Sequence, residues 1–394
     1  MSIRKILSIA GSVLVLLGIV LLIVLLIIGH FAGVHFLSGP PADTGDSLGV
    51  TAPTEPSAVG ATVCVLNTDP DRQALWQTLA DAYTAETGVK VQIVSHRDQA
   101  TLLSIAPGDT LPENPLDLSH TDAYIQLADL ALSMQDDRGR VLAVASEIQV
   151  FGLVYNSTLL AQTGHTRADI SGFKDLTEVV YGIADDQSRY GFSAFIPVDP
   201  NGHFASQVTA MPSDCRNLVD LILNIAPQAS VAEENSALHS FLEGKAVFLP
   251  AGSAEHDTLN AIGSENLGVL PVYTGAENEE NQTLCVSAAG YWCIDADARP
   301  EDVQATVDFL NYLTRPGADG AVPVDSLQIM SPYRQAAYKS NMLESVLRYD
   351  LAQGKKPVVC RPVQIVPLGL SQAISTYAQD PSDENWRGIT ELLH

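Results

Sequence analysis

The stretch ATVCVLNTDPDRQALWQTLADAYTAETGVKVQIVS, residues 61–95, decides the fold class. Its first seven residues are mostly apolar and rich in valine, which predicts a buried strand. Asp69-Pro70 supplies a helix N-cap followed by a proline at the first helical position, and Gly88 is the expected C-cap. The alternation in VKVQIVS predicts a second strand. A strand, a helix and a strand at this spacing form a βαβ unit, so we expect a parallel sheet.

The same alternation of strand-like and helix-like segments continues to the C-terminus. The remaining chain is too long for one compact sheet, so we expect an α/β protein with two lobes. No internal repeat is visible. The expected strands include residues 147–156, 189–198, 245–252 and 284–294, and the expected helices include residues 121–133, 157–164, 175–184, 217–226 and 300–314.

An apolar segment near the N-terminus is long enough to cross a membrane. Ile6 to Ile28 is 23 residues without a charge, whereas a spanning helix needs about 20 residues and the core of a signal peptide only about 7–15. Arg4 and Lys5 precede it, and the next cation is Arg72. The positive-inside rule therefore places the N-terminus in the cytoplasm and the following chain outside the cell. We favour an uncleaved single-pass membrane anchor over a long cleaved signal peptide; both export the rest of the chain.

Composition excludes several classes of protein. The chain has 394 residues, of which 46% are hydrophobic and only 17% charged, so it is neither fibrous nor disordered. Lys and Arg number 21 against 46 Asp and Glu, which gives a net charge of −25. Without clustered cations the chain is a poor binder of nucleic acids, because phosphate contacts need them.

The five cysteines offer no metal motif. They are Cys64, Cys215, Cys285, Cys293 and Cys360, an odd number without a CxxC pair. Outside the cell a disulfide is chemically possible, but most of these residues sit in apolar runs, where cysteine behaves as a small buried hydrophobe. An extended strand would hold Cys285 and Cys293 far apart, so we expect both to be free thiols.

Signals of catalysis are weak. The chain lacks a nucleophile elbow, a zinc-protease motif, a P-loop and a dinucleotide-binding fingerprint. His120 beside Asp122, or His203 after Asp199, offers acid–base chemistry, but a histidine in a loop is more often structural. We therefore expect no enzyme activity, no catalytic residue, no cofactor and no metal site.

Four segments in order carry a resemblance to a known family. They are ALWQTLADAYTAETGVKVQIV (74–94), FGLVYNSTLLAQTG (151–164), FLEGKAVFLPAGS (241–253) and VQATVDFLNYLT (303–314). Together they resemble the extracellular solute-binding proteins of ABC transporters, family 1, the carbohydrate-type group that is similar to maltose-binding protein. Each match is short, but their order behind an export segment is specific.

The resemblance implies a class II periplasmic-binding-protein-like fold, with two α/β lobes joined by crossing strands and ligand bound in the cleft between them. After an anchor or signal at residues 1–30 and a flexible linker at 31–60, lobe 1 is expected to hold residues 61–148 and 288–316. Lobe 2 then holds residues 149–287 and 317–394. Closure around the ligand would be a hinge motion, and the closed form would dock on a permease. The three crossings are expected near Glu147–Gly152, near Cys285–Ala289 and between Arg315 and Leu327.

The same resemblance places eleven residues in the ligand-binding cleft. Carboxylates and amides suit sugar hydroxyls, and aromatic faces suit the CH faces of sugars. Asp69 alternatively caps its helix, Phe195 alternatively belongs to the core, and Trp292 lies in a strand that is alternatively buried on both faces. The candidates are Asn67, Asp69, His120, Asp122, Gln149, Phe195, Asn201, Ser253, Tyr291, Trp292 and Tyr333.

The sequence departs from the family in two respects. The expected anchor is a helix rather than a lipidated cysteine, and there are only three tryptophans, with Ala254 where sugar binders often place an aromatic residue. The leading hypothesis is a monomeric, membrane-tethered extracellular protein that delivers a small solute, expected to be a sugar, to the permease of an ABC importer. The alternative is a sensory or interaction module on the same fold without a transport role. A hydrolase that uses His120 or His203 is the third hypothesis.

Overall fold

The computed structural model describes residues 60–196, 203–226, 236–317, 321–335, 341–362 and 365–393. The expected anchor at Ile6–Ile28, nearly all of the linker and the candidate Asn201 lie outside these residues. In the part of the chain that is described, no helix is both long enough and apolar enough to span a membrane.

The βαβ unit forms as predicted. Strand β1 (Thr62–Leu66) pairs in parallel with β2 (Lys90–Val94), and helix α2 (Gln73–Thr87) connects them. The side chain of Asp69 accepts a hydrogen bond from the backbone N–H of Asp71 and caps a 3₁₀ turn that leads into α2. Gly88 ends the helix in the left-handed conformation with φ of 77°, which glycine adopts without steric cost.

A nine-stranded sheet contains this unit. Its main path is β2-β1-β3-β8-β5-β4. The two long strands are β5 (Val141–Asn156) and β8 (Gln282–Ile294), which run antiparallel to each other. The shorter strands on this path are β3 (Leu102–Ile105) and β4 (Ser133–Gln135).

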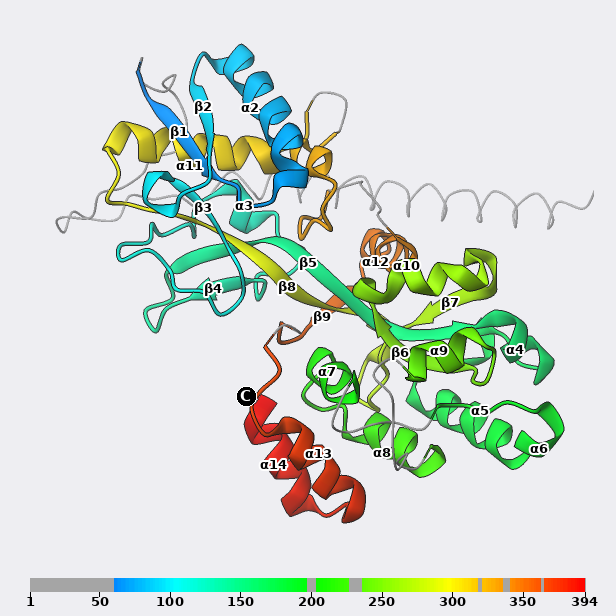
Figure 1. Cartoon of the computed structure of the whole chain (residues 1–394). Coiled ribbons are helices and arrows are strands. Elements are labelled where there is room, and N and C mark those ends of the chain that lie inside the picture. Colours follow the sequence, from blue (N-terminus) through cyan, green and yellow to red (C-terminus); the bar gives the residue numbers. More distant parts are fainter. Residues whose placement is uncertain are drawn as a thin grey trace, which may run out of the picture. The chain divides into compact units, whose positions relative to one another are not determined.

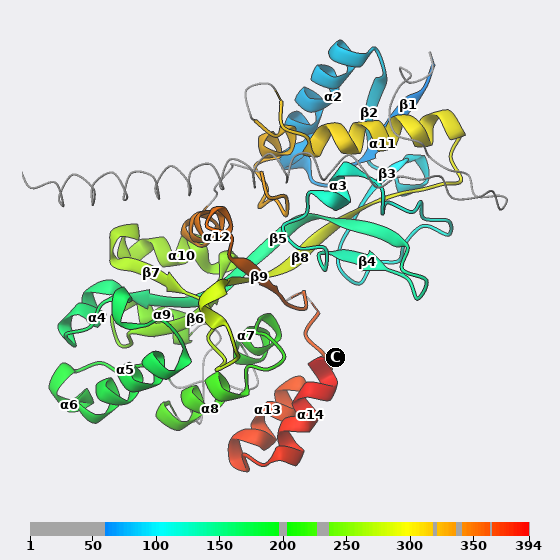
Figure 2. The same cartoon turned by 180° about the vertical axis from the view of Figure 1, so that it is seen from behind.

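The two long strands also pair with a second group of strands. The C-terminal half of β5 pairs with β6 (Phe248–Gly252) and β7 (Leu267–Leu270), and the first half of β8 pairs with β9 (Lys356–Val359). Figures 1 and 2 show β5 and β8 running from the group around β1, α2 and α11 to the group around β6 and β7. The structure is therefore a two-lobed α/β fold.

The helices lie on both groups. Those of the first group are α3 (Asp122–Ile125) and α11 (Pro300–Thr314), in addition to α2. The others are α4 (Ser157–Gln162), α5 (Phe173–Asp185), α6 (Gln187–Tyr190), α7 (His203–Ala210), α8 (Arg216–Ile225), α9 (Ser236–Leu242), α10 (His256–Leu259), α12 (Met342–Ala352), α13 (Leu370–Gln379) and α14 (Asp383–Leu393).

The first two expected crossings fall in these long strands. Ile148 pairs with Ala288 and Phe151 with Cys285, so the first two expected crossing stretches are neighbours in the sheet. The third crossing was expected between Arg315 and Leu327. The 3₁₀ helix that ends at Leu327 still packs against α2 and α11, and the Met330 carbonyl then accepts a hydrogen bond from the Ile148 N–H. The boundaries of the two lobes stay a prediction.

Two expected elements are wrong. The helix expected over residues 121–133 is only the four-residue α3, because the chain beyond it bonds elsewhere: the N–H of Ala128 donates to the Pro332 carbonyl. The strand expected over residues 189–198 begins in α6, and as far as residue 196, where the described part ends, it makes one parallel bridge, between Ser193 and Ala246. The backbone of both segments forms hydrogen bonds with residues that are distant in sequence. Local sequence patterns do not reveal such partners.

Candidate functional site

The loop after β1 is organised by an asparagine. The Asn67 side-chain N–H₂ donates to the Asp69 carbonyl at 2.8 Å and to the Gln73 Oε1 at 3.1 Å. Its Oδ1 accepts from the Asp69 N–H at 3.3 Å, and the residue is only 9% exposed. All these contacts lie within seven residues. Asn67 therefore fixes the shape of the loop in which the next polar residues stand.

Asp69 and Arg72 extend this network away from the loop. One carboxylate oxygen of Asp69 accepts the Asp71 N–H at 2.9 Å, and the other lies 3.3 Å from the Nε of Arg72. The Asp69 side chain is 44% exposed. The carboxylate therefore both caps the turn and orients the guanidinium, and part of it remains open to solvent.

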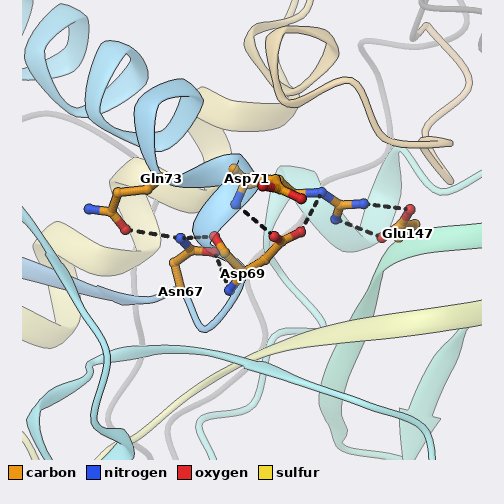
Figure 3. A network of polar contacts seen from close by, with 6 residues as sticks. Asn67, Asp69, Asp71, Gln73 and Glu147 are labelled. Atoms are coloured by element: carbon orange, nitrogen blue, oxygen red, sulfur yellow. Dashed lines mark hydrogen bonds and ion pairs between the residues drawn. The ribbon is translucent and has the colours of Figure 1, made fainter.

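Arg72 connects the loop to the first crossing strand. Its two terminal nitrogens donate to the two carboxylate oxygens of Glu147 on β5, at 2.9 and 3.2 Å (Figure 3). Burial alone would lower the pKa of Arg72, but the hydrogen bonds and charge of Glu147, together with the charge of Asp69, raise it. The guanidinium therefore stays charged, in a bidentate geometry that fixes both partners.

The position of Glu147 has a local cause. Between Ala145 and Ile148 the pairing of β5 with β8 shifts register, which marks a bulge, and bulges re-aim side chains. Glu147 is the only charged residue in the sixteen residues of β5. Its side chain is 28% exposed, so the charge is shared between Arg72 and solvent.

Two further candidates flank the same strand. Gln149 is half-buried and lies opposite Ser287 of β8, which is buried. Ser253 follows β6, and its hydroxyl oxygen accepts the Val150 N–H at 3.2 Å. The structure thus places Asn67 and Asp69 in one network with Glu147, and Gln149 and Ser253 at the part of β5 that continues from it.

Three of the four aromatic candidates lie in the core instead. Phe195 is 1% exposed and packs on Phe248, with ring centroids 5.7 Å apart. Trp292 is 2% exposed and lies between Trp76 and Tyr333, at centroid distances of 6.1 and 6.4 Å. Their rings fill space between elements, so in this structure they present no face to a ligand.

Tyr333 and Tyr291 differ in burial. Tyr333 is fully buried, and its hydroxyl donates to the Ala145 carbonyl at 3.1 Å. Tyr291 is half-buried and pairs with Ile105 of β3; burial raises its pKa. Of the four aromatic candidates, Tyr291 is the least buried.

The candidates of the loop around α3 are separate from this network. His120 is exposed. The carboxylate of Asp122 pairs with Arg315, and the Asp122 N–H donates to the Asn311 side chain at 2.8 Å. These contacts fasten α3 to the C-terminal end of α11, which is a structural role.

Four members of the network were not among the ligand-binding candidates of the sequence analysis: Asp71, Arg72, Gln73 and Glu147. A signal for two of them was present. Glu147 is a single charge in a long apolar run, and Arg72 is the first cation after the N-terminal segment. An isolated charge in an otherwise apolar strand requires a partner, because burying it unpaired is costly.

Comparison with known families now identifies the class. The sequence model of the bacterial extracellular solute-binding proteins matches residues 78–322. This match covers more than half of the chain, so the chain belongs to the bacterial extracellular solute-binding proteins. The resemblance seen in the sequence is confirmed. No curated protein matches the chain.

Solved structures show the same fold. The apo form of RafE from Streptococcus pneumoniae superposes with a TM-score of 0.58 at 14% identity, over 87% of this chain and 99% of RafE. The cyclic alpha-maltosyl-1,6-maltose binding protein from Arthrobacter globiformis gives 0.58 at 15% identity, over 84% and 97% of the two chains. A family 1 extracellular solute-binding protein from Bifidobacterium longum subsp. infantis gives 0.55 at 15%, over 84% and 97%.

Proposed function

We propose that the exported part of this chain binds a neutral carbohydrate beside the Arg72–Glu147 pair and delivers it to the permease of an ABC importer. Membership in the solute-binding family carries the class of function. The sugar is supported by the polar chemistry of the network and by the name of the Arthrobacter globiformis protein, which binds a maltose derivative.

The Arg72–Glu147 pair suits vicinal hydroxyl groups. A guanidinium has five N–H donors, and Glu147 engages two of them. Both side chains are about one third exposed. The free donors of Arg72 and the remaining lone pairs of Glu147 lie in fixed relative positions, and a sugar can meet donors and acceptors together because each hydroxyl both donates and accepts.

The charge of the network favours a neutral ligand over an anion. It contains three carboxylates, Asp69, Asp71 and Glu147, against the single guanidinium of Arg72. Two negative charges therefore remain, and they repel an acid such as a sugar phosphate. We expect a neutral sugar or polyol to bind, and an anionic solute to be rejected.

The anchor completes this proposal. The uncharged Ile6–Ile28 segment behind Arg4 and Lys5 is long enough to span the bilayer. With the Pro- and Gly-rich linker that follows, it would keep the binding protein close to a membrane permease. Fractionation with membranes at full mass is the expected result, and a mature N-terminus beyond Gly33 would indicate a cleaved signal peptide instead.

Thermal stability tests the sugar. We would heat the purified protein with a panel of neutral sugars, polyols, sugar phosphates and polyamines. A ligand at a hundredfold excess over its Kd stabilises the fold by about 2.7 kcal/mol, so Tm should rise with at least one neutral sugar. Arg72→Gln and Glu147→Gln should reduce that rise. Lys174→Ala, an exposed change on α5, is the matched control.

A sensory or interaction module is the second candidate. The observation in its favour is the burial of Phe195, Trp292 and Tyr333, which leaves fewer aromatic faces than a transported oligosaccharide would use. Absence of any thermal shift across the whole panel would favour this function and contradict transport. A permease encoded beside this chain would favour transport, and a sensor kinase there would favour the module.

A further inference from the structure

Three of the five cysteines meet in one place. Cys215 directly precedes α8, Cys285 is the fourth residue of β8, and Cys360 follows β9 directly. Cys215 is 0% exposed and Cys285 is 1% exposed, while Cys360 is half-buried. All three belong to the same apolar core, which also contains Phe248 and Tyr377. Three segments distant in sequence thus contribute one thiol each.

Strand pairing explains how Cys285 meets Cys360. Strands β8 and β9 are parallel, and Cys285 lies opposite Val358. The Cys360 N–H donates to the Val286 carbonyl at 2.8 Å, so the chain continues the ladder for one more residue. Cys360 is two residues beyond Val358, and side chains two apart point to the same face. Cys285 and Cys360 are therefore diagonal neighbours on that face, and the Cys360 thiol donates to the Val358 carbonyl at 3.7 Å.

We propose that Cys285 and Cys360 form a disulfide in the exported protein, while Cys215 remains a free thiol beside them. The family is extracellular, and disulfides form and persist in that compartment. All five cysteines are free thiols in this structure, as expected for Cys285 and Cys293, but that expectation considered only Cys293 as the partner of Cys285. Cys293 lies in a different apolar cluster, with Leu103 and Ala143.

The reaction is a thiol–disulfide exchange with an external small disulfide or a disulfide oxidoreductase as oxidant. Cys360, the most accessible of the three, loses its proton and attacks that disulfide, which releases one thiolate and leaves a mixed disulfide on Cys360. Cys285 then loses its proton and attacks the Cys360 sulfur, which releases the second thiolate. Two protein thiols are oxidised by two electrons, and the external disulfide is reduced to two thiols.

The order of these steps follows from the environment of the thiols. Contact with Cys360, followed by burial, raises the pKa of Cys285, and burial raises the pKa of Cys215. Both are therefore neutral and poorly nucleophilic near pH 7. Oxidation must begin at Cys360. Within the described residues, no group of three or more Cys, His, Asp or Glu side chains is arranged to hold a metal ion, so the cluster is assigned to sulfur chemistry.

Bond formation needs a small backbone adjustment. Diagonal neighbours on adjacent strands have Cα atoms roughly 7–8 Å apart, beyond the roughly 7 Å at which a disulfide forms without backbone movement. Cys360 lies just beyond the last residue of β9, so its Cα must come closer to that of Cys285 for the bond to form. The bond would fasten β8 to the chain that leads into α13 and α14, two helices whose Tyr377 and Trp386 pack in the same core.

Peptide mapping of the full chain tests the pairing. The protein is recovered from the exported fraction, unfolded without reductant, alkylated with iodoacetamide and digested. We expect the Cys285 and Cys360 peptides to be linked to each other and the Cys64, Cys215 and Cys293 peptides to be alkylated. Alkylation of all five cysteines would overturn the proposal, and a Cys215–Cys360 linkage would overturn the pairing.

Stability supplies a second readout. A reductant should lower the Tm of the wild-type protein by about 5 °C and leave the Tm of Cys360→Ser unchanged. The matched control is Cys64→Ser, another half-buried cysteine, in which the reductant effect should persist. An equal reductant effect in Cys360→Ser would contradict the disulfide. If Cys360→Ser does not fold, the mapping of the wild-type protein decides.

Discussion

Two arginine–glutamate pairs in this molecule differ in what surrounds them. Arg72 and Glu147 are 34% and 28% exposed, and their contacts to each other are side chain to side chain. Arg348 and Glu344 on α12 are 6% and 0% exposed. Arg348 also donates to the backbone carbonyls of Tyr333, at 2.7 Å, and of Ser331. The first pair thus faces solvent in part, and the second is enclosed by backbone.

The difference separates a binding role from a structural one. Burial lowers the pKa of Arg348 although Glu344 opposes this, whereas the pKa of Arg72 is raised. The enclosed guanidinium of Arg348 donates to backbone carbonyls and so fixes the backbone around Tyr333. Few of its N–H donors remain for a ligand. A partly exposed pair keeps donors and acceptors free. Of the two, only the Arg72 pair meets the requirements of a solute site.

The largest expected effect is on the buried pair. Arg348→Met leaves the fully buried Glu344 without this cation and leaves two backbone carbonyls without their donor, which should cost about 3 kcal/mol of folding free energy. Urea denaturation monitored by circular dichroism measures it. The control is Arg189→Ala, whose partner is the half-exposed Asp186. A loss below 1 kcal/mol for Arg348→Met would remove the distinction between the two pairs.

The next effect concerns ligand affinity at the exposed pair. Arg72→Gln removes the charge but keeps an amide donor, so it should weaken the best sugar from the thermal panel at least tenfold, or about 1.4 kcal/mol, with little change in stability. Titration calorimetry measures this Kd. Arg348→Lys, if folded, should leave the Kd within a factor of two. Unchanged affinity in Arg72→Gln would place the site elsewhere.

Local signals explain why part of the fold could be predicted. The caps at Asp69 and Gly88, and the alternation in VKVQIVS, act within a few residues, and they gave the βαβ unit correctly. Signals that depend on distant partners failed. Residues 126–133 are apolar enough for a helix, yet Leu127 forms an antiparallel β-bridge with Tyr333 instead. Nothing within the segment itself indicates such a partner.

The site was predicted only in part, for a similar reason. Asn67 and Asp69 were named as candidates because they follow the first strand, whereas Glu147 is 75 residues from Arg72 in the sequence. A family template gives the order of segments but not which face of a strand is covered, so Trp292 and Phe195 were placed at the site. Gly152 ends the first expected crossing. A Cβ there would lie 2.9 Å from the Leu270 carbonyl, so close packing against β7 requires glycine.

A third carboxylate–arginine pair extends the comparison to pH. Asp302 is 8% exposed and accepts hydrogen bonds from Arg299, at 2.7 and 2.8 Å, and from the Thr62 N–H at 2.8 Å. Burial alone would raise its pKa, but these hydrogen bonds lower it below the ordinary 3.8. A lowered pKa in the folded state contributes stability above the unfolded value that is lost as the pH falls through the folded value.

Asp302→Asn should therefore destabilise the protein by about 1 kcal/mol at pH 7, and this difference should shrink below about pH 3.8. Urea denaturation at pH 7, 5 and 3 measures it. Asp81→Asn, an exposed position on α2, is the control and should give no such trend. A difference that grows on acidification would contradict the sign of the pKa shift.

The smallest expected effect is the coupling within the exposed pair itself. Arg72→Gln, Glu147→Gln and the double variant form a cycle on folding free energy, and a partly exposed ion pair should give about 0.5 kcal/mol. Raising the salt from 0.1 to 1 M shortens the screening length from about 10 to 3 Å, so the coupling should fall further. A coupling of 2 kcal/mol or more, insensitive to salt, would make this pair as structural as the one on α12. The Arg72→Gln effect on sugar affinity would then report a disturbed loop. If the Arg72–Glu147 coupling is small and salt-sensitive while Arg72→Gln greatly weakens sugar binding, direct contact of Arg72 with the solute explains the lost affinity.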